Sequence, residues 1–159
     1  MRLATMRIFA LCALILLTLC SLAQAETAIA SGNRYALVIG NSAYKDKPLK
    51  NPANDARDMA GKLTALGFNV QLKVDAPLKD MDEAIRAFGN RLKKGGVGVF
   101  YYAGHGIQVA GVNYLVPIGA RLSSESDARY ECVDAGRVLG KMEDAGNELN
   151  IVILDACRN

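Results

Sequence analysis

The 159-residue sequence has a single histidine, four cysteines and no tryptophan. Any histidine-dependent chemistry must therefore use His105. Two of the cysteines, Cys12 and Cys20, lie in an apolar N-terminal segment. The other two, Cys132 and Cys157, are too few for a disulfide scaffold and lack the CxxC spacing of a zinc site. From these residues we expect no metal centre and no cofactor.

The sequence also lacks an excess of charge of either sign. Two of the 19 basic residues, Arg2 and Arg7, lie in the N-terminal segment, which leaves 17 basic against 16 acidic residues from residue 26 onward. A nucleic-acid-binding protein has a basic face or stripe, so we expect no nucleic acid partner. With 51% apolar and 22% charged residues, the composition indicates one folded domain.

Residues 1–25 have the three parts of a secretory signal peptide: a basic start, an uncharged apolar run over 8–22, and the small-residue cleavage site Ala23-Gln24-Ala25. The alternative is an uncleaved membrane anchor, but the apolar run is shorter than the roughly 18 residues that a spanning helix needs. We predict an exported bacterial protein, periplasmic or secreted, that does not stay inserted in the membrane after cleavage.

After a short polar lead over 26–33, strand and helix patterns alternate. Apolar runs predict strands over 35–39, 97–102 and 150–154, and an alternation of apolar and polar residues predicts a further strand over 68–72. Apolar residues spaced three and four apart predict helices over 52–66, 81–92 and 135–142. Residues 107–118 are typical of a small hairpin around Gly111. Right-handed crossovers make this an α/β protein with a mostly parallel sheet. Because the second strand alternates apolar and polar residues, we place it at an edge, which gives the order 2-1-3-4.

The glycines do not form a nucleotide-binding motif. Residues Gly40 to Tyr44 lack the second and third glycines of a dinucleotide fingerprint, and Gly61-Lys62 has no P-loop around it. His105 and Cys157 are the stronger candidates, since each follows the carboxyl end of a predicted interior strand. A thiol beside an imidazole can be activated as a nucleophile. The alternative is that His105 is a partly buried structural residue.

Two motifs around these residues resemble a known family. Tyr101-Tyr-Ala-Gly-His-Gly106, followed by Leu154-Asp-Ala-Cys-Arg-Asn159, resembles the caspase-like cysteine peptidases (peptidase C14), which include caspases, metacaspases and bacterial caspase-like proteins. The 52 residues from His105 to Cys157 are close to the caspase spacing of about 50. Arg34 to Asn41 and Asn51 to Arg57 also resemble the family's first strand and first helix.

The resemblance implies a three-layer caspase-like sandwich with its catalytic domain over 34–159. Family members have two further strands after the catalytic cysteine, so we expect the chain to be incomplete at its C-terminus. The strand over 150–154 would then have an uncovered edge, so we expect self-association through that edge and little peptidase activity from the 159 residues alone.

The resemblance also implies roles for individual residues. Cys157 would be the nucleophile, His105 would carry the proton, and the backbone N–H groups of Gly106 and Cys157 would form the oxyanion hole. Asp55 and Asp155 match the acidic floor of the metacaspase specificity pocket, which implies cleavage of peptides or proteins after Arg or Lys. Asp55 has a second explanation, because the helix dipole favours a carboxylate in a first turn. A calcium requirement is possible by the same resemblance.

Three functions therefore remain open. The first is an exported cysteine endopeptidase with a His105–Cys157 dyad. The second is a caspase fold retained as a non-catalytic interaction module. The third is an unrelated exported α/β binding protein in which the histidine and the cysteine are core residues.

Overall fold

The structure is a computed structural model that describes residues 33–92 and 96–158, with the backbone alone for residues 157 and 158. The predicted signal peptide over 1–25 and nearly all of the polar lead lie outside the described residues. No helix in the described part of the chain is long and apolar enough to cross a membrane.

Four parallel strands form the centre of the sheet: β1 (Arg34–Gly40), β2 (Asn69–Val74), β3 (Val97–Val109) and β6 (Leu149–Arg158). They lie in the order β2-β1-β3-β6, because β1 pairs with β2 and β3, and β3 pairs with β6. The predicted α/β class and the predicted order of the four strands are therefore confirmed. Within the described residues β2 pairs with β1 alone, as expected of the alternating strand.

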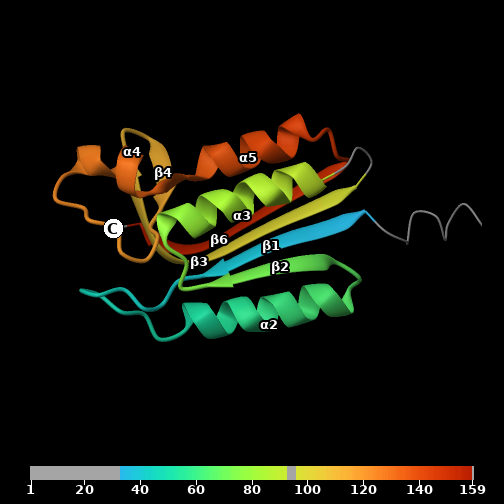
Figure 1. The fold of residues 1–159 in the computed structure, drawn as a ribbon, viewed down its shortest axis with the longest axis horizontal. Coiled ribbons are helices and arrows are strands. Elements are labelled where there is room, and N and C mark those ends of the chain that lie inside the picture. The colour runs from blue at the N-terminus through green and yellow to red at the C-terminus, as the bar shows by residue number, and fades with distance from the viewer. Residues whose placement is uncertain (1–32, 93–95, 159) are drawn as a thin grey trace, which may run out of the picture. The chain divides into compact units, whose positions relative to one another are not determined.

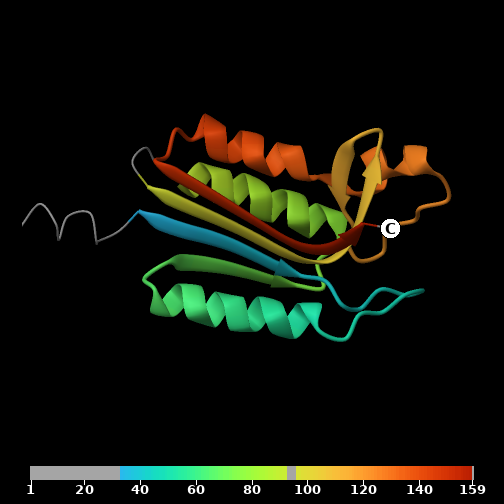
Figure 2. The same ribbon diagram turned by 180° about the vertical axis from the view of Figure 1, so that it is seen from behind.

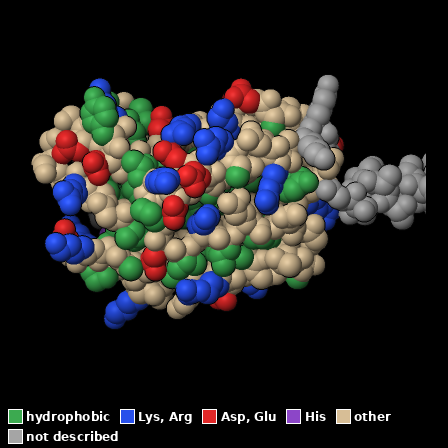
Figure 3. Space-filling model, in the orientation of Figure 1, with side chains coloured by type: hydrophobic (Ala, Val, Ile, Leu, Met, Phe, Trp, Pro, Cys, Tyr) green, Lys and Arg blue, Asp and Glu red, His purple; other side chains and the backbone are tan. Residues whose placement is uncertain are grey.

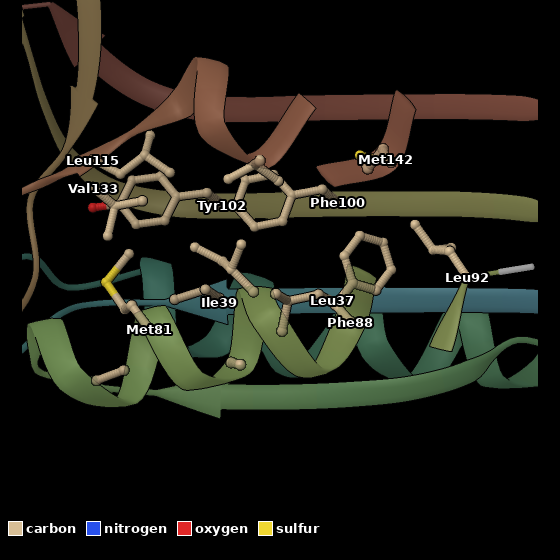
Figure 4. Packing of buried hydrophobic residues seen from close by; sticks show 14 residues of the cluster. Leu37, Ile39, Met81, Phe88, Leu92, Phe100, Tyr102, Leu115, Val133 and Met142 are labelled. Carbon is tan, nitrogen blue, oxygen red and sulfur yellow. The ribbon is translucent and has the colours of Figure 1, made fainter. Parts of the chain in front are cut away.

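Helices cover both faces of this sheet, which gives three layers (Figures 1 and 2). Helix α2 (Pro52–Ala65) lies on one face, and α3 (Leu78–Arg91) and α5 (Ala135–Asp144) lie on the other. Successive side chains of a strand point to opposite faces, so β1 and β3 supply both cores. The core beneath α2 includes Val38 and Tyr101. The larger core beneath α3 and α5 includes Ile39 and Tyr102 (Figure 4).

Beyond the parallel region, β3 continues into the predicted hairpin. Its last residues pair antiparallel with β4 (Val112–Leu115), and β4 pairs with the two-residue strand β5 (Val133–Asp134). Gly111 occupies the turn with φ of 83°, a conformation that glycine adopts without steric cost. A short 3-10 helix η1 (Glu125–Asp127) and helix α4 (Ala128–Glu131) precede β5 and were not predicted from the sequence.

The surface over α3 and α5 carries charges of both signs. Figure 3 shows Lys and Arg side chains intermixed with Asp and Glu on this face, without a continuous basic stripe. One pair is an ion pair between the helices, in which Arg137 donates to Asp82 over 2.8 Å.

Candidate active site

A buried asparagine joins the loops at the carboxyl end of the sheet. Asn41 follows β1 and is fully buried, and its backbone N–H donates to the carbonyl of Ala103 on β3 over 2.9 Å. Its side-chain oxygen accepts from the N–H of Ala76, and its side-chain nitrogen donates to the carbonyl of Val116. The loops after β1, β2 and β4 are thereby fixed relative to one another around the end of β3.

Two tyrosine hydroxyls bind the backbone N–H and carbonyl groups of His105. The hydroxyl of Tyr44 accepts from the N–H of His105 over 3.0 Å and donates to the carbonyl of Val116 over 2.9 Å. The hydroxyl of Tyr102 lies 2.7 Å from the carbonyl of His105 and 3.2 Å from the hydroxyl of Tyr44. Burial raises the pKa of both tyrosines, so both hydroxyls stay protonated near neutral pH.

Gly104 is needed where these hydroxyls meet. A Cβ atom at this position would lie 2.7 Å from the hydroxyl oxygens of Tyr44 and Tyr102. That distance is well inside van der Waals contact, so a side chain would displace at least one hydroxyl from the His105 backbone. The glycine before the histidine in this motif therefore leaves room for the tyrosine network.

The imidazole of His105 is held in one orientation by two contacts. Its ring packs against that of Tyr44, with 4.4 Å between ring centroids and 53° between planes. Its Nε2 atom lies 2.7 Å from the backbone carbonyl of Lys47. A carbonyl oxygen can only accept a hydrogen bond, so Nε2 carries the proton. In the neutral ring Nδ1 is then the nitrogen with a free lone pair.

Cys157 lies on the neighbouring strand β6, paired with this histidine. The parallel register of β3 and β6 pairs His105 with Cys157 and Ala103 with Asp155. Since neighbouring strands are about 4.8 Å apart, the backbones of His105 and Cys157 are one strand spacing apart. Cys132, by contrast, is buried, and burial raises the pKa of its thiol to about 11, so this thiol is a poor nucleophile near neutral pH.

Asp55 and Asp155 come together around Tyr101. Asp55 lies half-buried in the first turn of α2, and Asp155 lies on β6 with a carboxylate oxygen 3.5 Å from the Tyr101 hydroxyl. Burial first, and then the negative charges of Asp155 and Asp55, raise the pKa of Tyr101 to about 12. The structure thus places both predicted acidic residues near one side chain of β3. Asp55 also has the first-turn position that the helix dipole favours.

Gly106, the predicted backbone donor, lies in β3 next to His105 and is half-buried. In the part of the chain that the structure describes, no group of three or more His, Cys, Asp or Glu side chains could hold a metal ion. Calcium also takes backbone and amide carbonyls as ligands, so the calcium requirement stays an expectation from the resemblance, and we derive no step through it.

Sequence reasoning missed Asn41, Tyr44 and Lys47. An aromatic residue in the otherwise polar segment after β1 was a weak signal for Tyr44. Lys47 acts through its backbone carbonyl, so its residue type carries no signal at all.

Comparison with known proteins agrees with this arrangement. The family model of the caspase domain, Peptidase_C14, matches residues 33–159. The human mucosa-associated lymphoid tissue lymphoma translocation protein 1 is 34% identical over 127 residues, which is 79% of this chain and 15% of that protein. Its mouse homolog matches to the same extent. The chain thus spans about 15% of the length of these curated relatives.

A solved structure shares the fold. The crystal structure of protein GSU0716 from Geobacter sulfurreducens matches with a TM-score of 0.62 at 21% identity, over 78% of this chain and 50% of that one. Together with the family match, this defines a caspase-like α/β domain. The chain belongs to the caspase-domain family, Peptidase_C14. The hypothesis of an unrelated α/β binding protein is thereby excluded.

Proposed function

We propose that this caspase-domain chain is an exported cysteine endopeptidase that uses His105 and Cys157 as a catalytic dyad and cleaves after Arg or Lys. The observation that carries the proposal is the pairing of Cys157 with a histidine whose Nε2 is already bonded to the Lys47 carbonyl. Family membership supports a peptidase, and the dyad, the specificity and export are our own proposals.

In this proposal Nδ1 of His105 makes every proton transfer, since Nε2 is bonded to the Lys47 carbonyl. Nδ1 takes the proton of the Cys157 thiol, and the thiolate attacks the carbonyl carbon of the scissile peptide bond. As the tetrahedral intermediate collapses, the C–N bond breaks and Nδ1 gives its proton to the leaving amine. Water then hydrolyses the thioester, transferring a proton through Nδ1, and the free acid and thiol are released. The N–H groups of Gly106 and Cys157 are the proposed donors to the oxyanion.

The acidic cluster around Tyr101 supports specificity for basic residues. The charges of Asp55 and Asp155 both raise the pKa of Tyr101. Two carboxylates therefore lie close to the Tyr101 side chain, which precedes His105 on β3. A guanidinium or ammonium group gains charge-assisted hydrogen bonds from such carboxylates, whereas an acidic side chain is repelled.

Cleavage of matched fluorogenic peptides tests this function. We expect the wild-type chain to cleave slowly after Arg and not after Asp. Cys157→Ala and His105→Ala should each abolish turnover by about the same factor, because members of a dyad act as a unit. Cys132→Ala is the matched control, since its buried thiol has no role in the proposed chemistry. Activity retained in either dyad variant, or efficient cleavage after Asp with none after Arg, would contradict the proposal.

A further inference from the structure

A cavity of about 310 Å³ opens beside His105. Its walls come from the loop after β1, the end of β3 and the segment after β4, and include Tyr44, Lys47, His105, Ile107, Val116 and Leu122. Figure 1 shows the loop after β1 and the segment after β4 both projecting beyond the carboxyl end of the sheet. Neither Asp55 nor Asp155 lines this cavity.

The surface of the cavity wall is mostly apolar and comes from Ile107, Val116, Ala120 and Leu122, while the loop after β1 adds the charged residues Lys45, Asp46 and Lys47. Ile107 lies on β3, and Leu122 lies on the segment after β4 with 39% of its surface exposed. Gly119 and Ala120 contribute little bulk between them. Such a cavity gains free energy from an apolar side chain that leaves water to enter it, and its volume falls in the range of small ligand sites.

The position of His105 in the cavity wall indicates which residue of a peptide substrate would occupy the cavity. The imidazole protonates the leaving amine, and that nitrogen belongs to the residue that follows the scissile bond. This residue must therefore lie next to His105. The acidic cluster lies around Tyr101, which precedes His105 on β3. A peptide with its basic side chain over the carboxylates then places its next residue at the cavity.

We propose that this cavity is a specificity subsite for the residue immediately after the scissile bond, and that it selects an aliphatic side chain such as leucine. The proposal rests on the peptidase function argued above. It adds a second determinant to the substrate, so that the preferred sequence is a basic residue followed by an aliphatic one.

Competition between peptides that differ only after the arginine tests the subsite. Peptides with leucine or glycine at that position are mixed with the wild-type chain, and the ratio of their kcat/KM values is measured by mass spectrometry of the products. We expect leucine to be preferred about tenfold or more, the range that apolar pockets give for small differences in side chain. In Leu122→Ala, which removes part of the wall, the ratio should fall about threefold or more.

Leu139→Ala is the matched control. Leu139 lies on α5 with 42% of its surface exposed and does not line the cavity, so the leucine-to-glycine ratio should stay at the wild-type value. Equal cleavage of both peptides by the wild type, or equal ratios in the two variants, would overturn the subsite while leaving the peptidase function intact. If the wild type cleaved neither peptide, the peptidase function and the subsite would both be wrong.

Discussion

At the scale of single residues, Tyr44 serves His105 in two separate ways. Its ring packs against the imidazole, and its hydroxyl accepts from the His105 N–H. Phenylalanine would keep the ring and remove the hydroxyl, which leaves a partly buried N–H group without its partner. Such a loss costs about 1–3 kcal/mol.

We therefore expect Tyr44→Phe to lower the free energy of unfolding by about that amount and to lower kcat more than it raises KM. Urea denaturation and steady-state kinetics measure the two effects. Tyr130→Phe is the control, because Tyr130 is 73% exposed and should change neither. An unchanged kcat in Tyr44→Phe would show that the hydroxyl does not position the histidine.

One physical reason explains why Asn41, Tyr44 and Lys47 could not be predicted as site residues from the sequence. Tyr44 and Lys47 act on a histidine far along the chain, and the loop that brings them together is fixed by Asn41 through contacts with two other loops. None of these contacts produces a local pattern of residue types in the sequence. By contrast, the motif around His105 and the one around Cys157 could be found, because their residue types carry the chemistry directly.

At the scale of elements, the close approach of α2 to β1 fixes the position of Asp55. A Cβ atom on Gly40 would collide with the carbonyl oxygen of Pro52 and lie 2.5 Å from the Cβ of Ala56. Both contacts are at the start of α2, so a side chain here would push that end of the helix away from the sheet.

We expect Gly40→Ala to destabilise the domain by about 1–3 kcal/mol, the usual cost of overpacking. Gly61→Ala is the control: Gly61 lies within α2 with open space around its Cβ position, and alanine there should stabilise by up to about 1 kcal/mol. Thermal unfolding of both variants measures the difference. A Gly40→Ala domain as stable as the wild type would show that the helix start has room to move.

The long helices and strands could be predicted because the spacing of apolar residues differs between a helix and a strand. The four parallel strands and the three long helices were confirmed, and so was the hairpin around Gly111. The segment 125–134 was not predictable. Its helices span three and four residues, and its strand β5 exists through pairing with β4, so pairing partners and not local sequence decide its structure.

At the scale of the whole molecule, β6 presents apolar side chains to solvent. Within the described residues it pairs with β3 alone. Five of its residues are 38–50% exposed: Leu149, Ile151, Val152, Ile153 and Leu154. Edge strands of this kind pair readily with other chains.

We propose that the 159-residue chain self-associates through this edge, and that Ile151→Lys weakens the association, because a charge on an edge strand opposes pairing. Light scattering over a range of concentrations measures the mean mass. Leu139→Lys is the control, since Leu139 has similar exposure on α5. A wild-type chain that is monomeric at all concentrations would contradict this proposal.

Labelling with a thiol-directed electrophile on a peptide ending in arginine tests the His105–Cys157 dyad. Peptide mapping of the labelled chain identifies the modified cysteine. We predict rapid modification of Cys157 and none of Cys132. In His105→Gln the rate at Cys157 should fall by about 100-fold or more, because the proton acceptor is lost. Modification of Cys157 at the same rate in both proteins, or of Cys132 as fast as Cys157, would contradict the account.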